Sequence, residues 1–165
     1  MITGRAVTGV FHLINKTPFE WFAKKQATVE SATYGSEYVG SKTASQQIMG
    51  ARTTLRYLGV RVHGPTRMFG GNGSVVTSST IPESPLKKRH HALAYHYTRE
   101  AIASGAIDYH HLPGDINPAD ILSKHWEFAT IWPLLQPILF WHGDASVLDT
   151  KVKGSDRIPS KSPTT

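Results

Sequence analysis

The chain has 165 residues, 39% of them hydrophobic, with 4 Trp, 6 Tyr and 6 Phe. This length and content predict a single domain with its own core and argue against disorder. The absence of Cys excludes a disulfide framework and thiolate metal sites and fits a reducing compartment. No apolar run approaches the roughly 18 residues of a membrane span, and no signal peptide is apparent. We therefore expect an intracellular, soluble protein in the cytoplasm or nucleus.

The charge balance is basic. Lys and Arg number 18 and Asp and Glu number 12, which gives a net charge of +6 and an isoelectric point near 9.7. Such an excess favours a polyanionic partner, most simply a nucleic acid. A basic protein without such a partner explains the charge equally well.

The first third of the chain predicts a hairpin and a long helix. Two strand-like runs, Ala6–Ile14 and Phe19–Ala23, flank a turn signal at Asn15–Pro18, which favours an antiparallel hairpin. Apolar residues at helical spacing then predict one helix over residues 30–59. Three internal glycines weaken it, and Gly59 is suited to cap its C-terminus.

The remaining chain alternates strands and helices. Short strands are expected at residues 65–69 and 106–112, and helices at residues 72–79 and 91–105, with Gly105 ending the second helix. A turn and a further helix start follow in "PGDINPADILSKH", before an apolar run with two prolines. The order ββ–α–β–α–β–α predicts an α/β fold in which the later strands pair in parallel through helical crossovers.

Acidic residues are few, and three of them are candidates for a metal site. Glu37 lies near a predicted helix start, and Asp115 and Asp120 lie around "NPAD". Singly, such residues are more often solvated or capping groups. Carboxylates gathered at the ends of adjacent elements can hold Mg²⁺, and two such ions can promote phosphodiester cleavage.

Other motifs carry weaker signals. "FGGNGS" lacks the lysine and the spacing of nucleotide-binding loops, so it does not predict a phosphate cradle. His91 and His96 are five residues apart, which does not match a helical zinc pair. The basic residues of "KKRHH" (Lys87, Lys88 and Arg89) suit phosphate contacts or a solvated face.

Three stretches resemble the ribonuclease H domain of copia-type retrotransposon Pol polyproteins. "WFAKKQATVESATYGSEYV" is similar to W-S-S-K-K-Q-x-T-V…S-x-x-E-A-E-Y of that family. "MFGGNGSVV" resembles its hydrophobic-x-x-D-N-Q-S-A/V strand motif. "KKRHHALAYHYTREAIASGAIDYHHLPGDINPADILSKH" resembles R-x-K-H-I-x-x-x-x-H-x-x-R-E…Y-x-P-x-x-x-N-P-A-D-I-L-T-K. We accordingly divide the chain into a partial ribonuclease H-like domain (4–126), an apolar extension packed on it (127–149) and a disordered tail (150–165).

The resemblance implies a mixed sheet flanked by helices whose carboxylates bind two Mg²⁺ ions and hydrolyse the RNA strand of an RNA–DNA hybrid. It also implies an origin in a polyprotein that carries reverse transcriptase. The matching carboxylates of this chain are Glu37 and Asp120, which are the expected catalytic and metal-binding residues. His111 and Asp115, both in the loop "HLPGDI" that precedes Asp120, are weaker assistants.

The departures from the family pattern affect its chemistry. The aspartate of D-N-Q-S falls on Gly71 and its glutamine on Gly73. The family's first aspartate lies in a strand before the region that matches "GRAVTGVF", so we expect this chain to lack the first strand and to be an inactive remnant. One alternative is a basic nucleic-acid-binding module that uses the cationic side chains of Lys24, Lys25, Lys87, Lys88 and Arg89. Others are an active enzyme completed by an upstream segment, or a reading frame without a selected function.

Overall fold

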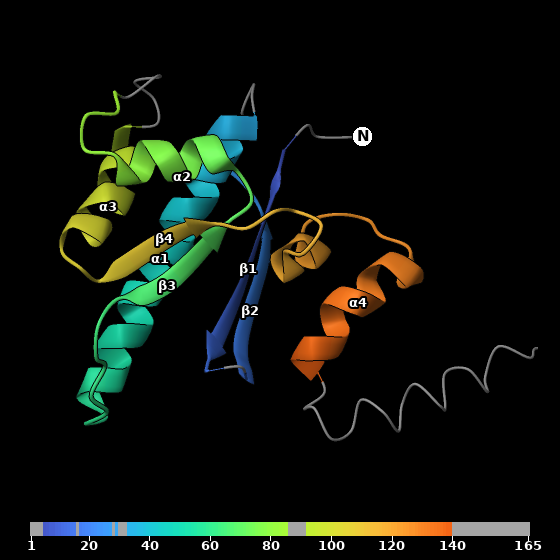
Figure 1. Cartoon of the computed structure of the whole chain (residues 1–165), viewed down its shortest axis with the longest axis horizontal. Helices are drawn as coiled ribbons and strands as arrows, with labels where there is room; N and C mark the ends of the chain where they lie inside the picture. The colour runs from blue at the N-terminus through green and yellow to red at the C-terminus, as the bar shows by residue number, and fades with distance from the viewer. Residues whose placement is uncertain (1–4, 16, 28, 30–32, 86–91, 140–165) are drawn as a thin grey trace, which may run out of the picture.

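The structure is a computed structural model that describes residues 5–15, 17–27, 29, 33–85 and 92–139. In chain order its elements are β1 (Val7–Ile14), β2 (Thr17–Lys25), α1 (Thr33–Tyr57), β3 (Thr66–Gly70), α2 (Gly73–Thr80), α3 (Ala92–Ala103), β4 (Ile107–His111), the 3-10 helix η2 (Pro118–Leu122) and α4 (Phe128–Leu139). Figure 1 shows these elements in a mixed α/β arrangement.

The predicted antiparallel hairpin is confirmed, and its turn is shorter than expected. Pairing runs from Val7 opposite Lys25 to Ile14 opposite Thr17. Asn15 adopts a positive φ of 58°, a conformation that asparagine tolerates better than most residues. The prediction that Pro18 belongs to the turn is wrong, because it lies in β2. Since β2 pairs only with β1 among the described strands, it is an edge strand, where proline is accepted.

The long helix α1 is continuous through its three glycines. Its buried residues recur every three or four positions along one face: Gly35, Tyr38, Ser41, Ser45, Ile48 and Arg52. The predicted cap at Gly59 is confirmed, with a φ of +77°. The amide of Gly59 donates to the Arg56 carbonyl and that of Val60 to the Leu55 carbonyl, which is a Schellman motif.

Strands β3 and β4 form the predicted parallel pair. Thr66 lies opposite Ile107 and Gly70 opposite His111, and the connection between the strands passes through α2 and α3. Helix α3 ends as expected at Gly105, which has a φ of +69°. The carboxyl ends of both strands therefore lie at the same edge, next to the start of α2.

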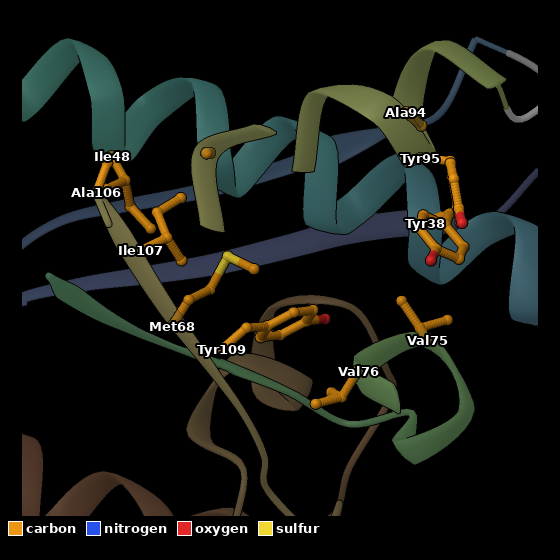
Figure 2. Packing of buried hydrophobic residues seen from close by; sticks show 11 residues of the cluster. Tyr38, Ile48, Met68, Val75, Val76, Ala94, Tyr95, Ala106, Ile107 and Tyr109 are labelled. Atoms are coloured by element: carbon orange, nitrogen blue, oxygen red, sulfur yellow. The ribbon is translucent and has the colours of Figure 1, made fainter. Parts of the chain in front are cut away.

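The apolar core lies in one part of the molecule. Side chains from β3 and β4, including Met68, Ile107 and Tyr109, point toward the helices, where they meet Tyr38 and Ile48 of α1 (Figure 2). The rest of this cluster comes from α2, α3 and Ala106. Among the described residues, none from the hairpin, η2 or α4 belongs to it.

The four strands form two separate two-stranded sheets, β1–β2 and β3–β4. The α/β class and the presence of both antiparallel and parallel pairs are confirmed, whereas the expected single mixed sheet is not formed. The reason is topological, because no strand of the described residues lies between β1 and β3. Helix α1 contacts both strands and therefore spans the two sheets (Figure 1).

Polar contacts attach the hairpin to the rest of the fold. The buried Gln26 donates through Nε2 to Thr8 Oγ1 (2.9 Å) and to the Ser36 carbonyl of α1 (2.8 Å). His12 is hydrogen-bonded to Gln47 of α1 at 3.1 Å. These contacts align β1 along α1 without adding to the apolar core.

Helix η2 packs on the hairpin at a glycine. A Cβ at Gly9 of β1 would lie 2.7 Å from the Ala119 carbonyl oxygen and 2.9 Å from the Leu122 Cβ. Both distances are shorter than a side chain tolerates, so the close approach of η2 requires glycine here. This contact sets the position of Asp120, which η2 carries.

Helix α4 contains Pro133 and Pro137, contacts η2 and has no buried residue. The packing of residues 127–149 stays a prediction, because residues 140–149 lie outside the described residues, as does the tail at 150–165. Across the described residues, no helix combines the length and the apolar character that crossing a membrane requires.

Candidate functional site

A cavity of about 750 Å³ opens where α1, the β3–α2 corner, the end of β4 and η2 meet. It is lined by Thr33, Glu37, Gly71, Asn72, Gly73, Ser74, Thr77, Ser78, Ser84, His111, Gly114, Asp120 and Lys124. The cavity thus gathers residues from segments that lie far apart in the sequence. It also contains both carboxylates that sequence analysis singled out.

The β3–α2 corner is organised by Asn72. Its side-chain Oδ1 accepts hydrogen bonds from the amides of Ser74 (3.0 Å) and Val75 (3.3 Å), which caps α2. The glycines on either side, Gly71 and Gly73, are not among the glycines with positive φ. The backbone of this corner therefore accepts ordinary L residues.

Space around the corner leads to the same conclusion. A Cβ at Gly71 would meet only the Asn117 Nδ2, at 3.6 Å, and one at Gly73 would meet the His111 ring, also at 3.6 Å. These are ordinary van der Waals distances. A Cβ at position 71 is therefore sterically compatible with the fold, and the position lines the cavity.

The preceding residue, Gly70, is different. A Cβ there would lie 2.3 Å from the Tyr109 hydroxyl oxygen and 2.9 Å from two of its ring carbons. Tyr109 is fixed by a hydrogen bond of 2.7 Å between its hydroxyl and Ser41 Oγ, and burial raises the pKa of Tyr109 to about 12. Gly70 is required by packing, whereas Gly71 is not.

Glu37 lies near the start of α1 and is partly buried beside the cavity. Burial raises the pKa of Glu37 above its ordinary value of 4.5, because desolvation disfavours the carboxylate. The nearby Asp120 raises this pKa as well, whereas the Lys124 ammonium lowers it. The two carboxylates and the lysine therefore act on one another electrostatically.

Asp120 is positioned by the start of η2. The Asn117 side chain accepts a hydrogen bond from the Ala119 amide (3.1 Å), and Pro118 occupies the first turn, where its missing N–H costs no hydrogen bond. The Asp120 side chain is only 16% exposed. Its Oδ2 accepts a hydrogen bond from the Lys124 ammonium at 2.5 Å.

The structure brings together four of the predicted positions. Glu37, Asp120, Gly71 and His111 line one cavity, and His111 Nε2 lies 3.3 Å from the Gly71 carbonyl oxygen. Asp115, a weaker candidate, is exposed and is not part of the lining. Within the described part of the chain, no three His, Asp or Glu side chains form a group that could hold a metal ion.

Sequence reasoning overlooked Lys124 as a site residue. The signal was its spacing from Asp120, since residues four apart lie on one side of a helical turn. Here the Lys124 amide donates to the Asp120 carbonyl at 3.0 Å, so the two side chains are one turn apart. This contact places an ammonium group directly beside a candidate metal ligand.

The predicted nucleic-acid-binding lysines lie elsewhere. Lys24 and Lys25 are exposed on β2, opposite Thr8 and Val7, and do not line the cavity. As successive residues of a strand they project from opposite faces of the hairpin. Lys87, Lys88 and Arg89 lie outside the described residues.

Sequence comparison relates this α/β chain to the Pol polyproteins of retrotransposons. It is 25% identical over 119 residues to the retrovirus-related Pol polyproteins from transposons RE1 and RE2 of Arabidopsis thaliana. Each match covers 72% of this chain and 8% of the polyprotein, so the chain spans less than a tenth of these relatives. No protein-family profile and no solved structure matches it. The similarity supports a common origin with a segment of retrotransposon Pol.

Proposed function

We propose that this chain is the remnant of a copia-type ribonuclease H domain and that it does not cleave RNA–DNA hybrids. The proposal rests on the residues that line the cavity. Glu37 and Asp120 line the cavity at positions where the resembled family has metal-binding carboxylates, and Gly71 lines it at the position of the family's second aspartate, that of D-N-Q-S. The corner that holds Gly71 does not require glycine, which is consistent with the loss of a functional side chain.

The chemistry of the cavity supports inactivity. Two-metal hydrolysis needs carboxylates that hold both Mg²⁺ ions, because these ions together stabilise the attacking and the leaving oxygen. The cavity offers two carboxylates, and one of them is already paired with Lys124. These residues do not fit a two-metal site.

The direct test is a cleavage assay with an end-labelled RNA–DNA hybrid in Mg²⁺ or Mn²⁺. We expect no cleavage above that of a sample without protein, while an active ribonuclease H cleaves in parallel. The matched variant is Glu37→Ala, which removes a carboxylate of the cavity. Metal-dependent cleavage by the unmodified chain that Glu37→Ala abolishes would contradict the proposal and exclude a contaminating nuclease.

A second candidate function is an active enzyme completed by a strand from outside this chain. The observation in its favour is that the described strands form two two-stranded sheets, so each of them, including β1 and β3, has one unpaired edge. Helix α1 contacts both β1 and β3. Unpaired edges are templates for strand addition. The two candidates differ for an extended chain that carries such a strand. If the remnant proposal is correct, this chain should cleave hybrids only when Gly71→Asp is also introduced. Cleavage by the extended chain with Gly71 in place would support this second candidate.

A third candidate is a nucleic-acid-binding module without catalysis. Trp21 is 67% exposed and projects from the same face of β2 as Lys25, four residues away. Four residues of a strand span about 13 Å, so the indole and the ammonium suit a base-stacking contact and a phosphate contact on different nucleotides of one strand. Binding should weaken as salt increases and should fall in Trp21→Ala and Lys25→Gln, measured by fluorescence anisotropy with labelled hybrid. Binding that is independent of salt would remove its electrostatic basis.

A further inference from the structure

We propose that β2 is a self-association strand, whose free edge pairs with β2 of a second copy of this chain in an antiparallel ladder with two-fold symmetry. No residue of β2 lines the cavity, so the inference is independent of the proposed function. It rests on three properties of the strand, which are an open edge, main-chain groups that point outward and a complementary pair of charges.

The outer edge of β2 is open within the described part of the chain. The strand pairs only with β1 among the described strands, and none of its residues is buried. The elements that cover the hairpin reach β1 instead, since His12 is hydrogen-bonded to Gln47 of α1 and η2 packs at Gly9. A row of unpaired N–H and C=O groups is a template for another strand.

The hydrogen bonds of the hairpin determine which main-chain groups of β2 point outward. The Gln26 amide donates to the Ala6 carbonyl at 2.8 Å, one step beyond the paired residues of the two strands. Hydrogen-bonded pairs alternate with non-hydrogen-bonded pairs along an antiparallel ladder. The main-chain groups of residues 20, 22 and 24 therefore point to β1. Those that point to the free edge belong to Trp21, Ala23 and Lys25.

One register of the proposed ladder places opposite charges face to face. When Trp21 lies opposite Ala23 of the second copy, the outward groups of both residues form hydrogen-bonded pairs, and Glu20 lies opposite Lys24. The two-fold axis repeats this charge pair, so the ladder contains it twice. The pair occupies a non-hydrogen-bonded position, where facing Cα atoms are about 4.5 Å apart and the side chains are closest.

Other registers lack this match. A shift by two residues keeps the hydrogen bonds but places Glu20 or Lys24 opposite Phe22. A shift by one residue sets outward groups against inward ones and loses the hydrogen bonds. Glu20 and Lys24 are exposed, and neither forms an ion pair with another described residue, so both are available to a second copy.

The charges of β2 also select its partner. Lysine and proline on an edge strand usually prevent strand addition, and β2 carries Pro18, Lys24 and Lys25. Pro18 lies outside the stretch from Glu20 to Lys24 that forms the charge pairs. The Lys24 ammonium disfavours a strand that sets an apolar or cationic residue opposite it, whereas a second copy offers a carboxylate. The edge is therefore suited to its own sequence.

The helix beside the hairpin leaves room for a second copy. Neighbouring strands lie about 4.8 Å apart, so the two β1 strands of the ladder would be about 14 Å apart. Helix α1 contacts β1, and packed helices need only about 8–10 Å between their axes. The two α1 helices are therefore not expected to collide. Because the ladder is short, the dimer belongs to the small, transient class of interfaces.

The test is sedimentation equilibrium of the full chain from low micromolar to near-millimolar concentration, without nucleic acid. We expect the mass of the wild type to rise from 18.2 kDa toward twice that value. Glu20→Lys should weaken association by about tenfold, because both charge pairs become repulsive. Glu100→Lys on α3 changes the net charge by the same amount and should associate as the wild type does.

A charge swap tests the register. Lys24→Glu alone should weaken association as Glu20→Lys does, because it makes the same two pairs repulsive. The double variant Glu20→Lys with Lys24→Glu exchanges the charges and should restore the wild-type affinity to within about threefold. A wild type that stays monomeric, association that Glu20→Lys leaves unchanged, or a double variant as weak as the single ones would overturn the inference.

Cross-linking locates the contact if the charge variants do not fold. The chain has no Cys, so introduced thiols form only the disulfides under test. Trp21→Cys and Ala23→Cys change exposed residues that would face each other with Cα atoms about 5.5 Å apart, which a disulfide spans. A mixture of the two variants should form disulfide-linked heterodimers under mild oxidation.

Each cysteine variant alone is the matched control. Identical positions of the two copies lie on a diagonal of the ladder, about 7–8 Å apart, which is too far for a disulfide. Neither variant alone should therefore cross-link. Cross-linking as efficient in either variant alone as in the mixture, or none in the mixture, would refute the proposed pairing.

Discussion

Two regions of this molecule are held together by different forces. The region built from α1, β3, α2, α3 and β4 contains the apolar core. The hairpin β1–β2 is fixed instead by hydrogen bonds of Gln26 and His12 and by the contact of η2 at Gly9. Burial of apolar surface gives most folding free energy, so the first region should be the more stable one. The part of the cavity that rests on the hairpin should therefore be displaced more easily than the part that belongs to the core.

The cavity lies on the boundary between these regions. Glu37 and Gly71 belong to the region with the core, whereas Asp120 and Lys124 lie on or just after η2, which rests on β1. A disturbance of the hairpin should therefore move Asp120 relative to Glu37 without unfolding the core. The following predictions test this separation.

The largest effect is expected in the core itself. Ile48→Ala removes a buried side chain of α1 and should lower the free energy of unfolding by about 2–5 kcal/mol. The matched variant Ile14→Ala truncates a side chain of the hairpin that is 48% exposed, and should change stability by less than about 0.5 kcal/mol. Urea denaturation measures both. Equal losses of unfolding free energy in the two variants would contradict the view that the core region is the more stable of the two.

A smaller loss of stability is expected when the adjacent glycines Gly70 and Gly71 are replaced. Gly70→Ala places a methyl group against Tyr109 and should cost about 1–3 kcal/mol, as overpacking of a core does. Gly71→Ala meets no close atom and should stay within about 0.5 kcal/mol of the wild type. Thermal denaturation of the two variants side by side distinguishes them. A large loss in Gly71→Ala would mean that glycine is structurally required there.

The hairpin contact should have a local effect. Gln26→Ala removes the hydrogen bonds to Thr8 and Ser36 and should lower the free energy of unfolding by about 1 kcal/mol. The loss is limited because the substitution also removes Gln26 Oε1, a buried atom without a partner among the described residues. Hydrogen exchange should become faster in β1 and β2 and stay unchanged in β3 and β4. Faster exchange in both sheets would contradict the separation of the two regions.

The smallest effect depends on pH. Because the pKa of Glu37 is raised in the folded state, its contribution to stability is present below about pH 4.5 and is lost as pH rises through the folded value. Glu37→Gln cannot ionise and should therefore be slightly more stable than the wild type at neutral pH. The difference should vanish below pH 4.5. A variant that is less stable than the wild type at pH 7 would show that the ionised carboxylate is favourable.

Sequence patterns predicted local structure well where the cause was local. The helix spacing of α1 and the terminating Gly59 and Gly105 depend on residues within a few positions of each other. The turn at Asn15 was predicted less well, because whether Pro18 joins a strand depends on whether that strand lies at an edge. That information is not contained in the neighbouring residues.

The sequence by itself determined the order of elements, the basic charge and the resemblance that marked Glu37, Asp120 and Gly71. Only the tertiary structure decided that the strands form two sheets and that Gly70 is required whereas Gly71 is not. The physical reason is that these features arise from distances between segments that packing brings together. Tyr109 contacts Gly70 from another strand, and η2 reaches the cavity because it rests on β1.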